Sequence, residues 1–217
     1  MGAMEFHPVV NFDEPYWVFD FSKPRKQAWE HPFKYTIGRY NEKRPGMYTA
    51  EIFEAQRDHH VGLDIGAPVG TPVFAFDEGE ICMVGLNDDE GSYGPTLITK
   101  HHFSSPEKKG SVTGLPATLW VLYGHLRSDV LNRWSPGDRF ERGQHLAHIG
   151  DESENGGWPP HVHIQLCRFE PSTCDLPGVV AEKDIAQALI DFPDPRLILG
   201  ELYNGLKEAF ERVYWMN

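Results

Sequence analysis

Cysteine is scarce in this sequence, and its scarcity excludes the small secreted folds that depend on several disulfides. The three cysteines among 217 residues are Cys82, Cys167 and Cys174, too few for a disulfide framework. We expect them to be reduced thiols in a cytosolic protein, with a Cys167–Cys174 disulfide as the alternative.

Positive charge and long apolar runs are also in short supply. Lys and Arg number 20 against 32 Asp and Glu, which gives a formal net charge of −12. Nucleic acids and anionic membranes attract basic patches, so we expect neither as a partner. No run of 18 apolar residues is present, and the first ten residues lack the segments typical of a signal peptide. The sequence therefore indicates a cytoplasmic protein, or a periplasmic or secreted one if a signal segment once preceded it.

The amino-acid composition and apolar pattern divide the chain into three segments. Residues 1–50 are rich in proline and aromatics, and we interpret them as an irregular arm packed on the main body. Residues 51–170 consist of short β-rich runs broken by glycine and form the predicted central domain. The segment 171–217 is a predicted helical extension, because residues 181–190 and 197–215 have helical spacing of apolar residues.

The central region predicts a mainly β fold. Six short runs are rich in β-branched and aromatic residues: 71–76, 80–84, 96–101, 118–123, 140–149 and 161–166. A tight turn is expected between the first two, and the polar residues 104–114 are expected to form a long hairpin loop between the third and fourth. A further short strand is expected in the arm, within residues 16–21. With no helical pattern among the central runs, we expect a core of antiparallel β-sheet.

Histidine is concentrated in the same region. Nine of the eleven histidines lie between His59 and His163. Three motifs place them in patterned surroundings: His60-Val61-Gly62-Leu63-Asp64, Tyr123-Gly124-His125-Leu126 and His161-Val162-His163. Residues two apart on a strand point to one face, so His161 and His163 would present both imidazoles to the same side, with Cα atoms about 6–7 Å apart.

The spacing of the motif residues limits which of them can share one cation. His60 and Asp64 would be about 13 Å apart in an extended chain, too far for both to bind one ion. The glycines around them argue against a helix, so we expect a bend near Gly62 that turns both side chains inward. With a histidine of the HVH triplet they would offer two imidazoles, one carboxylate and an open position for water. This set is typical of zinc hydrolases, with Mn or Fe(II), as in iron oxygenases, as the alternative.

The order of these motifs resembles a known family. His60–Asp64, Gly70–Ala75, Tyr123–Leu126 and Pro160–His163 follow one another along the chain. They are similar to the HxGxD, GTPV-A, YxHL and HxH signatures of the M23 (lysostaphin/LytM-type) zinc metallopeptidases. The resemblance covers about residues 58–168 and implies an antiparallel β core of the LytM/M23 type.

The resemblance also implies a role for each motif residue. The zinc ligands would be His60, Asp64 and His163, holding one Zn²⁺ per chain, and the catalytic histidines would be His125 and His161. The usual HLHFE segment reads HVHIQ here, so a glutamine stands where the family has an acid that is not a ligand. No signature residue is missing, which gives no support for an inactive member.

The implied function is that of a zinc-dependent endopeptidase. By resemblance, the substrate would be a peptidoglycan cross-bridge or a similar peptide of glycine and D-amino acids. A net charge of −12 would be repelled by an anionic cell wall, so a peptide inside the cell is an alternative substrate. The competing function is a non-catalytic module that keeps the fold and binds or regulates a partner. The sequence indicates no oligomeric state.

Five other histidines lie in the region and are interpreted as surface or packing residues: His59, His101, His102, His145 and His148. The first of them precedes a proposed ligand and would point to the opposite side of an extended chain. Tyr93 and Trp158 are interpreted as core aromatics, with the lining of a substrate groove as the alternative.

Overall fold

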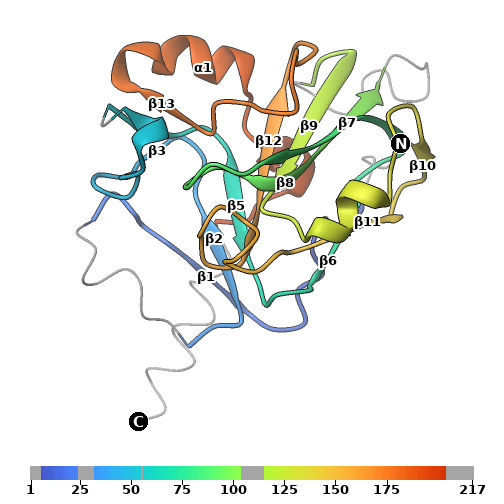
Figure 1. The fold of residues 1–217 in the computed structure, drawn as a ribbon, viewed down its shortest axis with the longest axis horizontal. Helices are drawn as coiled ribbons and strands as arrows, with labels where there is room; N and C mark the ends of the chain where they lie inside the picture. Colours follow the sequence, from blue (N-terminus) through green and yellow to red (C-terminus); the bar gives the residue numbers. More distant parts are fainter. Residues whose placement is uncertain (1–5, 24–31, 55, 104–114, 204–217) are drawn as a thin grey trace.

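An eight-stranded sheet dominates the computed structural model, which describes residues 6–23, 32–54, 56–103 and 115–203. The strands lie in this order: β1 (Tyr16–Val18), β2 (Tyr35–Gly38), β5 (Leu63–Gly66), β12 (His161–Cys167), β9 (Thr118–Gly124), β8 (Gly94–His102), β7 (Gly79–Asn87) and β10 (Arg139–Phe140). The first two strands pair in parallel and all other neighbours in this sheet pair antiparallel. The predicted fold class, mainly β with an antiparallel core, is confirmed (Figure 1).

Two small sheets flank the large one. In the first, β11 (His145–His148) pairs with β6 (Pro72–Phe74). In the second, β4 (Arg57–His60) lies between β3 (Glu42–Lys43) and β13 (Val179–Ala181). The segment interpreted as an irregular arm thus contributes β1 and β2 to the large sheet and β3 to a small one.

Both faces of the central strands are buried because a separate apolar cluster covers each face. Along β9 the side chains alternate: Val121 and Tyr123 join one cluster, whereas Trp120 and Leu122 join the other. The short helix α1 (Ile185–Asp191) covers the second face, where Ala188 packs in the same cluster as Trp120 and Leu122 (Figure 1). Burial on both faces explains why these strands are continuous apolar runs.

Helix α2 (Arg196–Leu199) contributes Ile198 to the cluster on the first face. Two C-terminal helices were predicted and both are present, with different bounds. The first begins after a 3₁₀ turn, η4 (Glu182–Asp184), and the second stops at Gly200, whose φ of +79° leaves the helical region. The rest of the predicted helix 197–215 lies mainly outside the described residues.

Two further predictions about strands need correction. Residues 71–84 do not form a hairpin, since β6 and β7 belong to different sheets. The fully buried Ala75 and Phe76 carry the chain between the two sheets through the core. Residues 140–149 are two strands rather than one, because Gly143 adopts a φ of +77° in a turn that separates β10 from β11.

The hairpin between β8 and β9 pairs as expected, with Leu97 opposite Tyr123 and His102 opposite Thr118. Its predicted loop, 104–114, lies outside the described residues. Two short 3₁₀ helices complete the fold, η2 (Glu51–Phe53) and η3 (Ser128–Asn132). Within the described ranges, no helix has the length and apolar character needed to cross a membrane.

Candidate metal centre and active site

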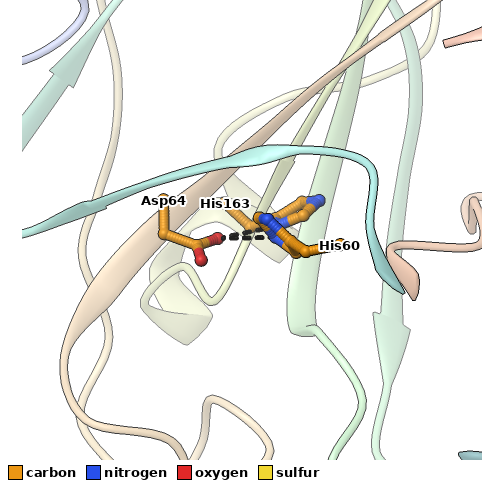
Figure 2. A group of neighbouring side chains, drawn as sticks. All are labelled: His60, Asp64 and His163. Carbon is orange, nitrogen blue, oxygen red and sulfur yellow. Dashed lines mark hydrogen bonds and ion pairs between the residues drawn. The ribbon is translucent and has the colours of Figure 1, made fainter. Parts of the chain in front are cut away.

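Three potential ligand atoms converge at one end of the large sheet. Nε2 of His60 lies 3.2 Å from Oδ1 of Asp64 and 3.2 Å from Nδ1 of His163, and that Nδ1 lies 2.9 Å from the same Oδ1. Figure 2 shows the carboxylate pointing at the two imidazole rings. Within the described part of the chain, this is the one group of three or more His, Cys, Asp or Glu side chains able to hold a metal.

Strand register explains why the three side chains meet. Asp64 on β5 lies opposite His163 on β12, so both point to the same face of the sheet. His60 ends β4, and the chain bends through Val61 and Gly62 before β5 begins. A Cβ atom at Gly62 would stand 2.2 Å from Cε1 of His163, so only glycine leaves room for this ring. The bend expected near Gly62 is therefore present, and it brings His60 beside Asp64.

The three atoms fit a metal ion. Ligands held tetrahedrally at about 2.0–2.1 Å from Zn²⁺ lie about 3.3 Å from one another, close to the observed separations. The outward nitrogens are occupied: Nδ1 of His60 donates to the carbonyl of Arg39 (2.9 Å), and Nε2 of His163 donates to Oε1 of Gln165 (3.2 Å). With both rings neutral, the inward nitrogens present lone pairs to the carboxylate and to each other. Three lone pairs that face one another in this way would favour a metal cation between them.

His125 and His161 lie beside the triad. Their ring centroids are 4.1 Å apart, and Nε2 of His161 lies 3.9 Å from Oδ1 of Asp64. Here too the outward nitrogen is held by a carbonyl: Nδ1 of His125 donates to Asn155 (2.7 Å) and Nδ1 of His161 to Pro159 (2.7 Å). Both rings therefore keep Nε2 as the nitrogen that can accept a proton.

The backbone at His125 is unusual. Its φ is +62°, the left-handed region that non-glycine residues seldom adopt. Two backbone hydrogen bonds hold it there, since its N–H donates to the carbonyl of Tyr93 (2.7 Å) and its carbonyl accepts from Gly150 (3.0 Å). Such a conformation persists where its surroundings fix it, and it often marks a functional position.

With the geometry established, the chain can be compared with known proteins. The model of peptidase family M23 matches residues 58–173, more than half of the sequence. The chain belongs to peptidase family M23. A comparison with curated proteins gives no significant match.

Several solved structures are similar to this M23 chain. The catalytic domain of the antimicrobial peptidase lysostaphin from Staphylococcus simulans is 22% identical, with a TM-score of 0.42 over 66% of this chain and 89% of that one. A mutant catalytic domain of the prophage-encoded M23 protein EnpA from Enterococcus faecalis is 27% identical, with a TM-score of 0.42 over 70% and 91%. A zinc-containing peptidase from Vibrio cholerae is 20% identical, with a TM-score of 0.40 over 68% of this chain. The M23 chain spans only 36% of that protein.

The electrostatics of the site favour neutral imidazoles around an ionised carboxylate. Burial, followed by the charge of Arg44, lowers the pKa of His60 to about 4. Burial likewise lowers the pKa of His161, and lowers that of His125 well below its usual value. Burial alone would raise the pKa of Asp64, but His60 and Arg44 together lower it well below the usual range. At neutral pH these histidines are therefore unprotonated and can act as ligands or bases.

A cavity of about 830 Å³ surrounds these side chains. His60, Asp64, His125, His161 and His163 all line it. Aromatic side chains from four separate segments of the M23 chain contribute to its wall: Phe19, Phe21, Tyr48, Phe53, Tyr93 and Trp158. Tyr93 and Trp158, interpreted from sequence as core residues, thus also face the cavity, which was the alternative interpretation.

Several residues of the site were missed by the sequence analysis. Gln165, noted only as a departure from the family pattern, accepts a hydrogen bond from His163 and another from the hydroxyl of Tyr93 (3.3 Å). Asn155 is fully buried and anchors His125 through its carbonyl. Arg44 donates to Oδ2 of Asp64 at 2.8 Å. The alternation of β12 could have indicated Gln165, which shares the face of the two histidines, whereas no local pattern marks the other two.

The five histidines interpreted from sequence as surface or packing residues are not part of this cluster. His59 is half-buried, and its Nε2 lies 2.6 Å from Oδ1 of Asn41. His101 is buried against Phe76, with Nδ1 donating to the carbonyl of Glu78 (2.9 Å). His102, His145 and His148 likewise have partners outside the site.

Proposed function

We propose that this M23 chain is a zinc-dependent endopeptidase. One observation carries the proposal: His60, Asp64 and His163 hold three ligand atoms within 3.2 Å of one another, and two further neutral imidazoles lie beside them. Two imidazoles and one carboxylate leave a fourth position for water, which is the arrangement of catalytic rather than structural zinc sites.

The proposed ligands are His60, Asp64 and His163, and they would hold one Zn²⁺ per chain. Zinc bound there would supply Lewis acidity, which polarises a peptide carbonyl and lowers the pKa of a water toward neutrality. The tautomers of His60 and His163 are fixed by Arg39 and Gln165, so both rings enter the site with the lone pair facing inward.

The proposed catalytic residues are His125 and His161. Each keeps Nε2 free, because a backbone carbonyl holds its Nδ1–H. A lowered pKa keeps both rings neutral at pH 7, so Nε2 of either ring is able to take the proton of an attacking water. The proton then passes to the amine that leaves when the peptide bond breaks. Until it gives up that proton, the imidazolium that carries it can also stabilise the negative charge that develops on the carbonyl oxygen.

We propose a peptidoglycan cross-bridge, or a similar peptide of glycine and D-amino acids, as the substrate. The support is membership of peptidase family M23 together with the cavity, whose aromatic side chains offer apolar surface for contact with a bound peptide. We also propose the division expected from the sequence, with a metallopeptidase domain at residues 51–170, an N-terminal arm at 1–50 and a C-terminal extension at 171–217.

A panel of peptides tests the proposal. Purified protein is depleted of metal with a chelator and then supplied with Zn²⁺, Mn²⁺ or Fe²⁺, and hydrolysis of Gly-Gly, D-Ala-Gly and L-Ala-Ala peptides is followed by mass spectrometry. We expect cleavage of the first two, restored by Zn²⁺ at one equivalent per chain. Zinc binding without cleavage of any peptide would instead favour a non-catalytic module. Activity restored only by Fe²⁺ with 2-oxoglutarate would favour an oxygenase.

A further inference from the structure

The guanidinium of Arg44 lies directly behind the candidate metal centre. This side chain is 3% exposed, and its Nη1 donates to Oδ2 of Asp64 at 2.8 Å, whereas Oδ1 of the same carboxylate faces the histidines. Oδ2 of Asp64 therefore accepts from the Arg44 guanidinium, and Oδ1 is left to face the candidate metal ligands. Arg44 precedes the segment matched by the M23 family model, which begins at residue 58.

Arg44 also contacts the support of a second candidate ligand. Its Nη2 donates to the carbonyl of Arg39 at 3.1 Å, and that carbonyl accepts the Nδ1–H of His60 at 2.9 Å. One guanidinium thus touches Asp64 directly and His60 through a single shared acceptor. The planar fork of arginine makes such divergent contacts possible, which the single ammonium of lysine cannot reproduce.

The surrounding residues are arranged to hold this guanidinium. Nε donates to Oε2 of Glu42 at 3.1 Å, and Nη1 donates to the hydroxyl of Tyr48 at 3.0 Å. Gly38 leaves the necessary space: a Cβ atom there would stand 2.7 Å from Oδ2 of Asp64 and 2.8 Å from Nη2 of Arg44. Buried charges need such partners, because an unpaired buried charge is strongly destabilising.

We propose that Arg44 is a positioning residue that fixes Asp64 as a single-oxygen ligand and holds the His60 ring in its binding orientation. The inference rests on the proposed function, since it takes these residues to bind zinc. It also means that a residue before the family match, which begins at residue 58, takes part in the candidate metal centre. Partners of this kind around metal ligands typically change metal affinity by about 10–100-fold when they are removed.

The sign of the change in affinity separates positioning from simple electrostatics. A cation beside the centre repels Zn²⁺, so loss of its charge alone would tighten binding. Loss of positioning acts in the opposite direction, because Asp64 can rotate and His60 loses part of its support. Weaker binding in a folded Arg44 variant therefore indicates lost positioning and not the lost charge.

The experiment measures the zinc dissociation constant of the full chain by competition with a chromogenic chelator, with thermal melting as the test of folding. We expect Arg44→Met to bind Zn²⁺ about 10–100-fold more weakly than the wild type. Arg44→Lys should also bind Zn²⁺ more weakly than the wild type, since it keeps the repelling charge and at most part of the fork. Gly38→Ala should also weaken binding, because it displaces the pair while Arg44 is retained.

The matched control is Arg196→Met, which removes an Arg–Asp pair (2.7 Å to Asp194) that does not line the cavity. It should bind zinc as the wild type does. Equal or tighter binding by Arg44→Met, or weakening by Arg196→Met to the same degree, overturns the inference. If Arg44→Met does not fold, wild-type affinity in both Arg44→Lys and Gly38→Ala overturns it. A wild-type chain that binds no zinc would instead refute the proposed function itself.

Discussion

The strands β11 and β12 each carry a pair of histidines, and the chain makes different use of the imidazoles of the two pairs. On β12, His161 and His163 face the same centre as Asp64. On β11, the ring centroids of His145 and His148 are 4.3 Å apart, nearly as close as the 4.1 Å between His161 and His125. No metal-binding group forms around them within the described residues. Closeness of imidazoles alone does not make a site.

The difference lies in what anchors each ring. In the candidate centre, the outward nitrogens are held by Arg39, Asn155, Pro159 and Gln165. The inward nitrogens of three of these rings, His60, His161 and His163, lie 2.9–3.9 Å from Asp64. On β11, Nε2 of His145 lies 2.8 Å from the carbonyl of Ala147, and Nδ1 of His148 lies 2.9 Å from Nη2 of Arg127. These ring nitrogens of β11 therefore already have hydrogen-bond partners and do not face a shared carboxylate. The candidate centre thus differs from β11 in having anchored rings that share one partly buried acid.

The largest effect expected is the complete loss of zinc in Asp64→Ala. Two histidines without the carboxylate give a weak site, so the metal content should fall from one equivalent to near zero. The counterpart near β11 is Asp129, whose Oδ2 lies 3.3 Å from Nδ1 of His148. Plasma emission spectroscopy of Asp64→Ala and Asp129→Ala compares the two acids directly, and we expect full zinc content only in the second. Equal zinc in Asp64→Ala and wild type would remove Asp64 from the proposed ligands.

The next effect divides the two histidines of β12. His163→Ala should lose both zinc and activity. His161→Ala should retain zinc and lose about 10²–10⁴-fold in kcat, the usual contribution of a general acid or base. Zinc analysis and peptide hydrolysis on the same preparations provide the test. If His161→Ala loses the metal and His163→Ala keeps it, the two roles are interchanged.

The third effect concerns acid stability of the metal-free protein. The pKa of His60 is about 4 in the folded chain and about 6.5 when unfolded, so the unfolded state takes up the proton first as the pH falls. The stability that neutral His60 contributes is complete above about pH 6.5 and is lost progressively toward pH 4. At most about 3 kcal/mol of unfolding free energy depends on it.

Urea denaturation of the metal-free wild type and His60→Gln between pH 7.5 and 4.5 measures this contribution. The wild type should lose more stability over that interval, because glutamine does not titrate. His145→Gln is the matched variant on β11. Burial also lowers the pKa of His145, but this ring is less buried than that of His60. Its pH dependence should lie close to that of the wild type. A parallel decline in wild type and His60→Gln would show that His60 does not cause the acid sensitivity.

Local patterns in the sequence were enough to predict the parts of the site that local geometry controls. The period of two on a strand placed His161 and His163 on one face, and the glycine-rich context predicted the bend that brings His60 to Asp64. The roles of these residues as ligands and catalysts stay predictions. The antiparallel core followed from the succession of apolar runs, which burial on both faces requires.

Contacts set by the register of distant strands were beyond such patterns. Arg44 follows β3, which pairs with β4, and it meets Asp64 beside Gly38, which β2 places opposite Asp64. No spacing in the sequence encodes these pairings. The hairpin expected over residues 71–84 failed for a related reason. A run of apolar residues can continue a strand or cross the core, and Phe76 does the second.

The smallest effect expected is that of His148→Gln on β11. The groups around this ring, Arg127 and Asp129, are more than 40% exposed, and exposed ion pairs contribute about 1 kcal/mol or less. The variant should lose no more than that in unfolding free energy and should keep full zinc content and peptide hydrolysis. The same three measurements on His161→Ala give the contrast, since that variant is expected to lose activity with its zinc intact. If His148→Gln lost activity as His161→Ala does, the histidines of β11 would belong to the functional site. The proposed difference between them and the histidines around Asp64 would then be wrong.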